Sequence, residues 1–216
     1  MKNLINFYQE VNRHSGQKFL LKDKEIIVDK EVFNPNTPTT KVMLDYMDQH
    51  PEIIQGKIVA DCRCGCGVLG INAVLNGAKE VFFSDFSPLA RINTEKNLKK
   101  MEFCKPVEVI ESDLLEDIPV SLDVIFFSHA LIPGQPKNGD WLEKNLFDDG
   151  QTLNRFFFQA LTFLKRDGKI FIPFNRNIGD TNSPAIVSGR KRNLQVKVSY
   201  QQETPEGEIV IYEFSH

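Results

Sequence analysis

The segment DCRCGCG, Asp61 to Gly67, sets an acidic residue, an arginine, three cysteines and two glycines between an apolar run and a helical pattern. Glycine-rich turns that join a strand to a helix present backbone N–H groups and let a ligand approach the main chain closely. Two more carboxylates end the next two apolar runs, Asp85 and Asp113. A carboxylate in the position of Asp85 can accept hydrogen bonds from both hydroxyls of a ribose. The turn and the two acids together favour a nucleoside site over a purely structural turn.

The cysteines suggest a metal site as the alternative to a nucleoside site. Cys62, Cys64 and Cys66 stand at alternate positions, and Cys104 follows much later in the chain. Structural zinc sites use C-x2-4-C pairs, and alternate residues of a tight turn do not easily point at one ion. We therefore interpret the thiols as small side chains packed in a crowded turn, with no metal and, without secretion, no disulfide.

Five short apolar runs predict the strands that position this turn. Four of the five are nearly unbroken, which is typical of strands buried on both faces of a parallel sheet. The runs are KIVAD (57–61), EVFFSD (80–85), PVEVIE (106–111), DVIFFS (123–128) and KIFIPF (169–174).

Helical patterns lie between these runs. PLARINTEKNLKKM follows Ser87, a good N-cap, and begins with Pro88. LNRFFFQALTFL carries an apolar face, and the RFFF within it (155–158) is interpreted as core. Gly77 and Gly168 stand where C-terminal caps are expected. The alternation of strand and helix predicts an open α/β sheet with helices on both faces.

The C-terminus changes its pattern. LQVKVSY (194–200) and part of EIVIYEF (208–214) alternate apolar and polar residues, with QQETPEG as a loop between them. Two such strands joined directly form an antiparallel hairpin. The predicted fold is therefore a Rossmann-like, seven-stranded, mostly parallel sheet closed by an antiparallel C-terminal hairpin.

The first 50 residues are predicted to form a small extension before a ligand-binding domain over 51–216. KNLINFYQEVNRH is a candidate short helix, and KFLLKDKEIIV a hairpin turning at Asp23-Lys24. A proline- and threonine-rich segment follows, which we expect to be extended and then helical from about Thr39 or Thr40.

Composition limits the cellular setting. The chain has 216 residues, of which 41% are hydrophobic, enough for one globular domain with a sizeable core. Its apolar runs fall short of the roughly 18–20 residues that a membrane helix needs, and charged and amide residues occupy the place of a signal-peptide core. We therefore expect a cytoplasmic protein with no membrane partner. The net charge of -3 argues against a nucleic-acid partner.

The core of the chain resembles a known class. VADCRCGCGVLGINAVLNGAKEVFFSDFSPLARINTEKNL is similar to the nucleotide-binding core of class I S-adenosylmethionine (SAM) methyltransferases, whose first motif reads D/E-x-G-x-G-x-G. The resemblance covers about residues 31–215. It is greatest to HemK-like and ribosomal-protein methyltransferases, through FNPNTPTT and LFDDGQTLNRFFFQAL.

The resemblance implies SAM as the cofactor and a set of residues that bind it. Carried over by position, Asp61, Gly65 and Gly67 would contact the methionine part, Asp85 the ribose and Asp113 the adenine edge. The remaining cofactor-binding candidates lie beside these positions: Arg63, Phe86, Leu114 and Ser128.

Two departures from the family pattern bear on function. Arg63 replaces the first glycine of the motif, and its guanidinium either pairs with the SAM carboxylate, which we favour, or fills the site. SHAL, Ser128 to Leu131, replaces the N-P-P-Y tetrapeptide with which HemK-like enzymes hold a substrate amide. The missing tetrapeptide therefore argues against methylation of release-factor glutamine, adenine or cytosine.

His129 and Ser128 are the catalytic candidates, because they follow the fourth strand, where chemistry occurs in this fold. An imidazole there can act as a general base for an N–H, O–H or S–H nucleophile, or it can be a structural histidine bonded to a loop. The loop IPGQPKNGDWLEKNLFDDG is a candidate lid or substrate wall. The substrate-binding candidates are Phe33, Asn36, Thr37, Thr39, Leu131 and Trp141.

Three functions stay open at this point. The first is methyl transfer from SAM to an N, O or S atom of a small metabolite or a protein side chain. The second is a different SAM reaction, such as an intramolecular cyclisation. The third is a catalytically silent module that binds a partner. The sequence indicates neither the acceptor nor the oligomeric state.

Overall fold

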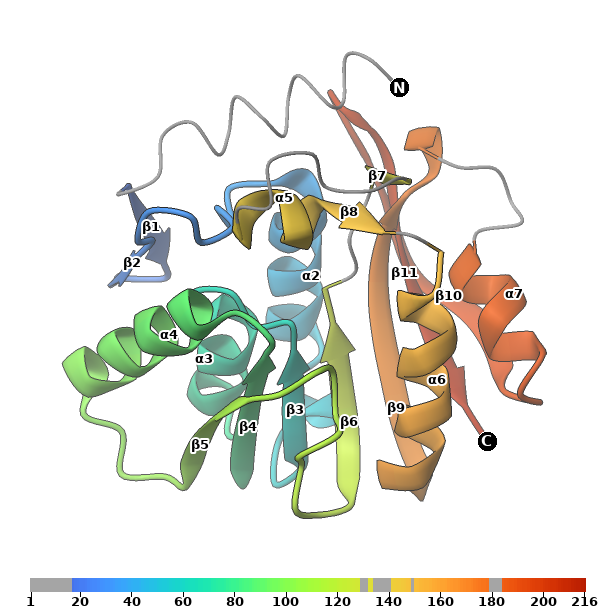
Figure 1. Ribbon diagram of the computed structural model, residues 1–216, viewed down its shortest axis with the longest axis horizontal. Helices are drawn as coiled ribbons and strands as arrows, with labels where there is room; N and C mark the ends of the chain where they lie inside the picture. Colours follow the sequence, from blue (N-terminus) through green and yellow to red (C-terminus); the bar gives the residue numbers. More distant parts are fainter. Residues whose placement is uncertain (1–16, 129–131, 134–140, 149, 179–183) are drawn as a thin grey trace.

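A seven-stranded sheet forms the centre of the molecule in the computed structural model, which describes residues 17–128, 132–133, 141–148, 150–178 and 184–216. Its strands are β3 (Ile58–Cys62), β4 (Glu80–Asp85), β5 (Val107–Glu111), β6 (Leu122–Phe127), β9 (Leu164–Asn175), β10 (Gln195–Thr204) and β11 (Gly207–Ser215). They are ordered β10-β11-β9-β6-β3-β4-β5 (Figure 1). The strands from β5 to β9 run parallel, and β11 and β10 are antiparallel additions. The predicted fold class is confirmed.

Helices cover both faces of the sheet (Figure 1). One side carries α2 (Pro38–Gln49), α3 (Val68–Leu75) and α4 (Pro88–Met101), and the other carries α6 (Thr152–Phe163) and α7 (Pro184–Arg190). The smaller elements are β1 (Lys18–Leu21), β2 (Lys24–Ile27), η1 (Pro51–Ile53), β7 (Ile132–Pro133), α5 (Trp141–Leu146), β8 (Phe147–Asp148) and η2 (Arg176–Ile178).

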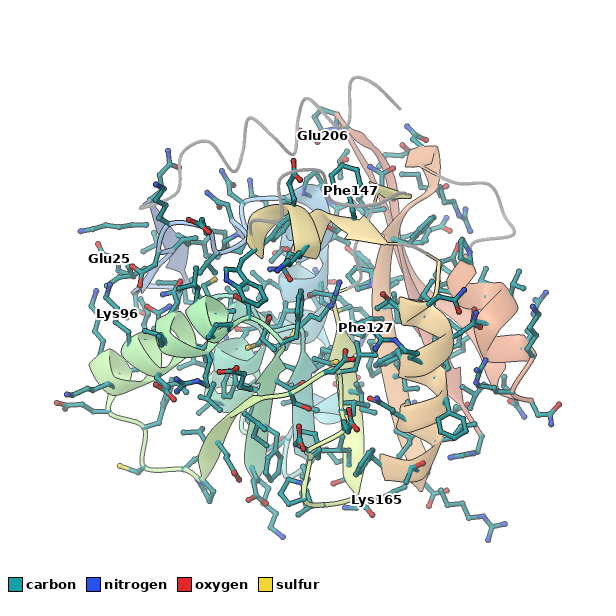
Figure 2. The ribbon with its side chains drawn as sticks, in the orientation of Figure 1. Glu25, Lys96, Phe127, Phe147, Lys165 and Glu206 are labelled. Carbon is teal, nitrogen blue, oxygen red and sulfur yellow. The ribbon has the colours of Figure 1, made fainter. Side chains whose placement is uncertain are left out.

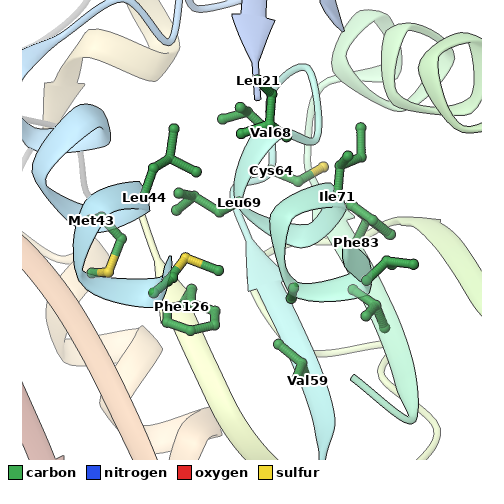
Figure 3. Close-up of a cluster of buried hydrophobic side chains, with 14 of the residues drawn as sticks. Leu21, Met43, Leu44, Val59, Cys64, Val68, Leu69, Ile71, Phe83 and Phe126 are labelled. Carbon is green, nitrogen blue, oxygen red and sulfur yellow. The ribbon is translucent and has the colours of Figure 1, made fainter. Parts of the chain in front are cut away.

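The central strands divide their side chains between two hydrophobic cores, because successive strand residues point to opposite faces. Val59, Phe83 and Phe126 enter the core under α2 and α3 (Figure 3). Their neighbours along the strands enter the core under α6 and α7. In that second core the rings of Phe127 and Phe156 stack with centroids 3.8 Å apart. The nearly continuous apolar runs in the sequence reflect this burial on both faces.

Several predicted boundaries are confirmed. Ser87 caps α4 by accepting a hydrogen bond from the N–H of Ala90, with Pro88 as the first helical residue. Gly77 follows α3 with φ +90°, a conformation that glycine adopts readily. The predicted start of α2 is late by one or two residues, because the Thr37 side chain caps a helix that begins at Pro38.

Other sequence predictions are wrong. Gly168 caps no helix but lies inside β9, since α6 ends at Phe163. Of the residues in RFFF, Phe156 and Phe157 lie in the core, whereas Phe158 is 70% exposed. Most of QQETPEG is strand, because β10 stays paired with β11 as far as Thr204 and Gly207.

The N-terminal segment is attached to the rest of the protein by asparagines. β1 and β2 form the predicted hairpin, with its turn one residue earlier, at Lys22-Asp23. On α4, Asn97 accepts from the N–H of Ile27 and donates to its carbonyl, and Asn93 accepts from the N–H of Asp29. The helix predicted within KNLINFYQEVNRH lies outside the described residues. Residues of α2 pack in the same hydrophobic core as the sheet. The division into an extension over 1–50 and a domain over 51–216 stays a prediction.

Within the ranges given above, no helix is long and apolar enough to cross a membrane.

Candidate functional site

The glycine turn lies where the strand order reverses. β3 ends at Cys62 between β4 and β6, and the turn leads from it into α3. In open α/β sheets, ligands bind at the carboxyl ends of the strands at this switch point. The backbone of the turn is left-handed at Arg63 (φ +60°), Gly65 (φ +57°) and Gly67 (φ +83°). A Cβ on Gly67 would also lie 2.9 Å from Thr94, so only glycine fits there.

Asp85 fastens the end of β4 to the turn. Its Oδ2 accepts from the N–H of Gly65 at 3.0 Å, and its Oδ1 accepts from the N–H of Ser87 at 2.9 Å. Burial raises the pKa of this carboxyl, while backbone hydrogen bonds from Gly65, Ser87 and Phe86 and the nearby charge of Arg63 act in the opposite direction. Each oxygen keeps a lone pair for a further donor, such as a ribose hydroxyl.

Asp61 is buried at the root of the turn. Its Oδ2 accepts from the N–H of Gly70 at 2.7 Å, and its Oδ1 is buried without a hydrogen-bond partner in the described part of the chain. Burial, with a smaller contribution from Asp85, raises the pKa of this carboxyl to about 7, against the lowering effect of the Gly70 bond. An unsatisfied buried oxygen is costly. A cationic donor such as the ammonium of the SAM methionine part fits this position.

Asp61 gives the first prediction, which concerns stability against pH. Its folded pKa of about 7 lies above the ordinary value of 3.8, so between these values the folded state holds a proton that the unfolded state has lost. Stability therefore falls as pH rises from about 4 to 7, by at most about 1.4 kcal/mol per pH unit from this group. Asp61→Asn should remove that part of the slope, measured by urea unfolding at pH 5, 6, 7 and 8.

Glu116→Gln, at an exposed carboxylate, is the matched control and should keep the wild-type slope. If Asp61→Asn unfolds with the wild-type dependence on pH, the raised pKa is wrong.

A cavity of about 70 Å³ lies against the turn. It brings together predicted residues from three parts of the chain, since Phe33, Thr39, Arg63, Gly65 and Ser128 all line it. The remaining lining residues are Pro35, Thr40, Cys64, Cys66, Val68, Leu69, Asn145 and Pro173. Sites for small molecules usually measure about 300–1,000 Å³, so this cavity is smaller than a typical small-molecule site.

A row of aromatic and cationic side chains links Arg63, which lines the cavity, to α5. The guanidinium carbon of Arg63 lies 4.8 Å from the ring centroid of Phe86, and the rings of Phe86 and Trp141 are 5.7 Å apart, edge to face. The Lys144 ammonium lies 4.2 Å from the Trp141 ring. These cation–π and aromatic contacts dock α5 on the end of β4.

The other predicted site residues lie elsewhere. Asp113 forms an ion pair with Arg155 and is half exposed, and Leu114 is buried with φ +63°. Thr37 is buried as the cap of α2. Asn36 lines a second cavity, of about 460 Å³, between the first turns of α2 and the tip of the β10–β11 hairpin. His129 and Leu131 lie outside the described residues.

Asn145 is the polar cavity residue that sequence reasoning missed. Its segment was predicted as a loop, but residues 141–146 form the short helix α5. The sequence holds no strong signal for this helix, because its position depends on the contact between Trp141 and Phe86.

The cysteines of the turn point to opposite sides of the sheet. Cys62 packs in the core under α6 and α7, and Cys64 and Cys66 pack in the core under α2 and α3. Burial raises the pKa of the Cys66 thiol to about 12, so it is uncharged at neutral pH. In the part of the chain that the structure describes, no group of three or more His, Cys, Asp or Glu residues is placed to hold a metal ion.

Comparisons with known proteins point to one class of enzyme. The family model of ribosomal protein L11 methyltransferase (PrmA) matches residues 36–128. A protein of Methanocaldococcus jannaschii, provisionally named as a protein N5-glutamine methyltransferase, is 24% identical over 190 residues, which cover 84% of this chain and 90% of that protein. The ribosomal protein L11 methyltransferase of Dichelobacter nodosus is 31% identical over 96 residues, which are 44% of this chain and 31% of that relative.

Among solved structures, a ribosomal protein L11 methylase from Lactobacillus delbrueckii subsp. bulgaricus has the same fold. Its TM-score is 0.64 at 18% identity, with 93% of this chain and 90% of that chain covered. Structures of similar fold also include a tRNA m1G37 methyltransferase and a 16S rRNA N2 G1207 methyltransferase in complex with AdoMet and guanosine. The expectation of no nucleic-acid partner therefore has no support from these comparisons.

The sheet order, the glycine turn and these matches define a class I SAM-dependent methyltransferase. Within this class, the chain is most similar to HemK-like and ribosomal-protein methyltransferases, but it lacks the N-P-P-Y tetrapeptide.

Proposed function

We propose that the chain transfers the methyl group of SAM to the carboxamide nitrogen of a protein side chain. The observation that carries this proposal is that the polar groups in the mostly apolar cavity lining are uncharged, apart from Arg63. Thr39, Thr40, Ser128 and Asn145 supply hydroxyl and amide groups there. Among the described lining residues the one charged side chain is Arg63, which we assign to the cofactor.

This lining suits a carboxamide better than an amine. A lysine side chain is protonated at neutral pH and needs a base before it can act as a nucleophile. No carboxylate belongs to the described lining of the cavity, so the described walls offer neither a counter-charge nor a carboxylate base. A carboxamide enters uncharged, and its hydrogen-bonding groups match hydroxyl and amide partners.

The second cavity supports a polypeptide as the carrier of that carboxamide. Its volume of about 460 Å³ is bounded by Asn36, Lys41 and Asp45 on one side and by Thr204 and Glu206 of the hairpin on the other. Glu206 lies at the same end of the molecule as Phe147, which follows α5, and Lys165 lies at the opposite end (Figure 2). Neighbouring residues of one segment, 33–41, line both cavities. A peptide that occupies the second cavity can therefore extend toward the first.

The relatives agree with a protein acceptor. The M. jannaschii relative, matched over most of both chains, carries the name of a protein glutamine methyltransferase. The absence of N-P-P-Y means that the amide has to be held by other residues than in the HemK-like enzymes.

The transfer itself needs no covalent intermediate. The carboxamide nitrogen forms a bond to the methyl carbon, the carbon–sulfur electron pair stays on sulfur, and one N–H proton passes to solvent. The products are an N-methylcarboxamide, S-adenosylhomocysteine and a proton. The chain's contribution is to align nitrogen, methyl and sulfur and to exclude water.

The test is a labelling experiment with the full chain, methyl-labelled SAM and an RNase-treated protein extract from the encoding organism. We expect label in polypeptide, released as methylamine by acid hydrolysis, together with S-adenosylhomocysteine. Asp85→Ala is the inactive control. Label that stays as methyl-lysine or methyl-arginine contradicts a carboxamide acceptor. Label found in RNA when RNase is omitted indicates a nucleic-acid acceptor, and methylthioadenosine as product indicates a cyclisation-type reaction.

A further inference from the structure

Asn145 has a fixed side-chain orientation. Its Nδ2 donates to the carbonyl oxygen of Trp141 at 2.9 Å. A carbonyl oxygen only accepts hydrogen bonds, so the group that faces it has to be the NH2 and not the oxygen of the amide. The Oδ1 atom of Asn145 is therefore directed away from Trp141, and it can act only as an acceptor.

The same helix face places Asn145 over the site. Trp141 and Asn145 are four residues apart in α5, so their side chains lie on one face of the helix. Trp141 contacts Phe86 at the end of β4, and Asn145 lines the cavity together with Ser128 from the end of β6. α5 therefore covers the carboxyl ends of the central strands (Figure 1).

We propose that Asn145 is the residue that selects and orients the acceptor carboxamide, with Oδ1 accepting one of its N–H groups. This inference rests on the proposed function of methyl transfer to a carboxamide. The two N–H bonds of a carboxamide lie in the amide plane, and the nitrogen lone pair stands perpendicular to that plane. An oxygen that holds one N–H in the plane therefore leaves the lone pair free to face the methyl group.

The arrangement also predicts which ligands are refused. An ester of the same shape has no N–H, so it leaves Oδ1 of the half-buried Asn145 without the partner that a carboxamide supplies. Sites built to bind an N–H discriminate against analogues that lack it, because the buried acceptor loses its water without replacement.

The experiment uses two matched peptides with the full chain and SAM. Ac-Ala-Gln-Ala-NH2 is the acceptor, followed by formation of S-adenosylhomocysteine. The same peptide with glutamate γ-methyl ester in place of glutamine is the analogue without the side-chain N–H. We expect the wild type to bind the glutamine peptide about tenfold more tightly than the ester peptide, from competition kinetics.

Asn145→Leu should reduce that ratio to about one, lower kcat/KM for the glutamine peptide about tenfold and leave the SAM dissociation constant within about twofold. Asn145→Asp keeps an acceptor oxygen but loses the Nδ2 hydrogen bond to Trp141, so it should retain part of the preference for the glutamine peptide. A purely structural role of Asn145 would weaken both peptides equally and leave the ratio unchanged, which would overturn the inference.

The outcomes also separate this inference from the function on which it rests. Methylation of the glutamine peptide with an unchanged ratio in Asn145→Leu overturns only the role of Asn145. Methylation of Ac-Ala-Lys-Ala-NH2 in preference to the glutamine peptide, or of neither peptide, overturns the carboxamide acceptor and the role of Asn145 together.

Discussion

Asp85→Ala should weaken the binding of SAM, S-adenosylhomocysteine and adenosine by a similar factor, about 30- to 1,000-fold. One buried carboxylate holds the N–H of Gly65, holds the N–H of Ser87 and, by our proposal, accepts from the ribose hydroxyls. Hydrogen bonds to a charged group contribute about 1.5–3 kcal/mol each, and the turn loses its preorganised shape at the same time. A loss of about 2–4 kcal/mol follows, which isothermal titration calorimetry measures directly.

Asp113→Ala is the matched control for Asp85. Asp113 also follows a strand at the same edge of the sheet, but it is half exposed and paired with Arg155. Its loss should weaken nucleoside binding less than about fivefold, since a half-exposed carboxylate that already pairs with Arg155 can offer the predicted adenine edge only a weak contact. Retention of wild-type affinity by Asp85→Ala, with thermal unfolding showing an intact fold, would exclude Asp85 as the ribose anchor. A loss confined to SAM, with adenosine unaffected, would place Asp85 at the methionine part instead.

The strands of the sheet could be predicted because burial leaves a direct mark on sequence. β3, β4 and β6 lie inside the sheet with helices on both sides, so nearly every position is apolar and the run is visible without an alignment. The roles of Ser87, Pro88 and Gly77 at helix ends could also be predicted, since each residue satisfies a local backbone requirement there. The order of acids and glycines then placed Asp61, Gly65 and Asp85 around one turn, where the structure also has them.

The parts that failed depend on tertiary contacts. α5 has few apolar residues at helical spacing, and its helix is held by the docking of Trp141 on Phe86, two residues 55 positions apart. The end of β10 is polar and reads as a loop, but it is extended because β11 offers it a paired backbone. Sequence also placed Asp85 at the end of its strand without indicating that both of its oxygens already bind main-chain N–H groups. Local patterns report burial and caps, and they do not report which distant group completes a hydrogen bond.

Arg63 is the residue for which structure changes the expectation most. It takes the left-handed conformation (φ +60°) that the family fills with glycine, and non-glycine residues there cost about 1–2 kcal/mol. Strain of this kind persists where it serves a site. Its guanidinium lies over the ring of Phe86, and its charge opposes the rise that burial gives to the pKa of Asp85, the carboxylate that we propose binds the ribose. We propose that the guanidinium leaves Phe86 when the cofactor binds and pairs with the SAM carboxylate.

Arg63→Gly should weaken SAM binding about 10- to 150-fold, through loss of a charge-assisted contact of about 1.5–3 kcal/mol. Adenosine has no carboxylate, so its affinity should stay within about threefold or increase as the face of Phe86 is uncovered. Glycine suits the backbone of this position, so the variant should fold at least as stably as the wild type, which thermal unfolding checks. Arg63→Lys is the matched control, because it keeps the positive charge but loses the planar guanidinium. Its affinity for SAM should lie between those of the wild type and Arg63→Gly. Equal weakening of SAM and adenosine would contradict the carboxylate contact. Tighter binding of both ligands would mean that Arg63 blocks the pocket.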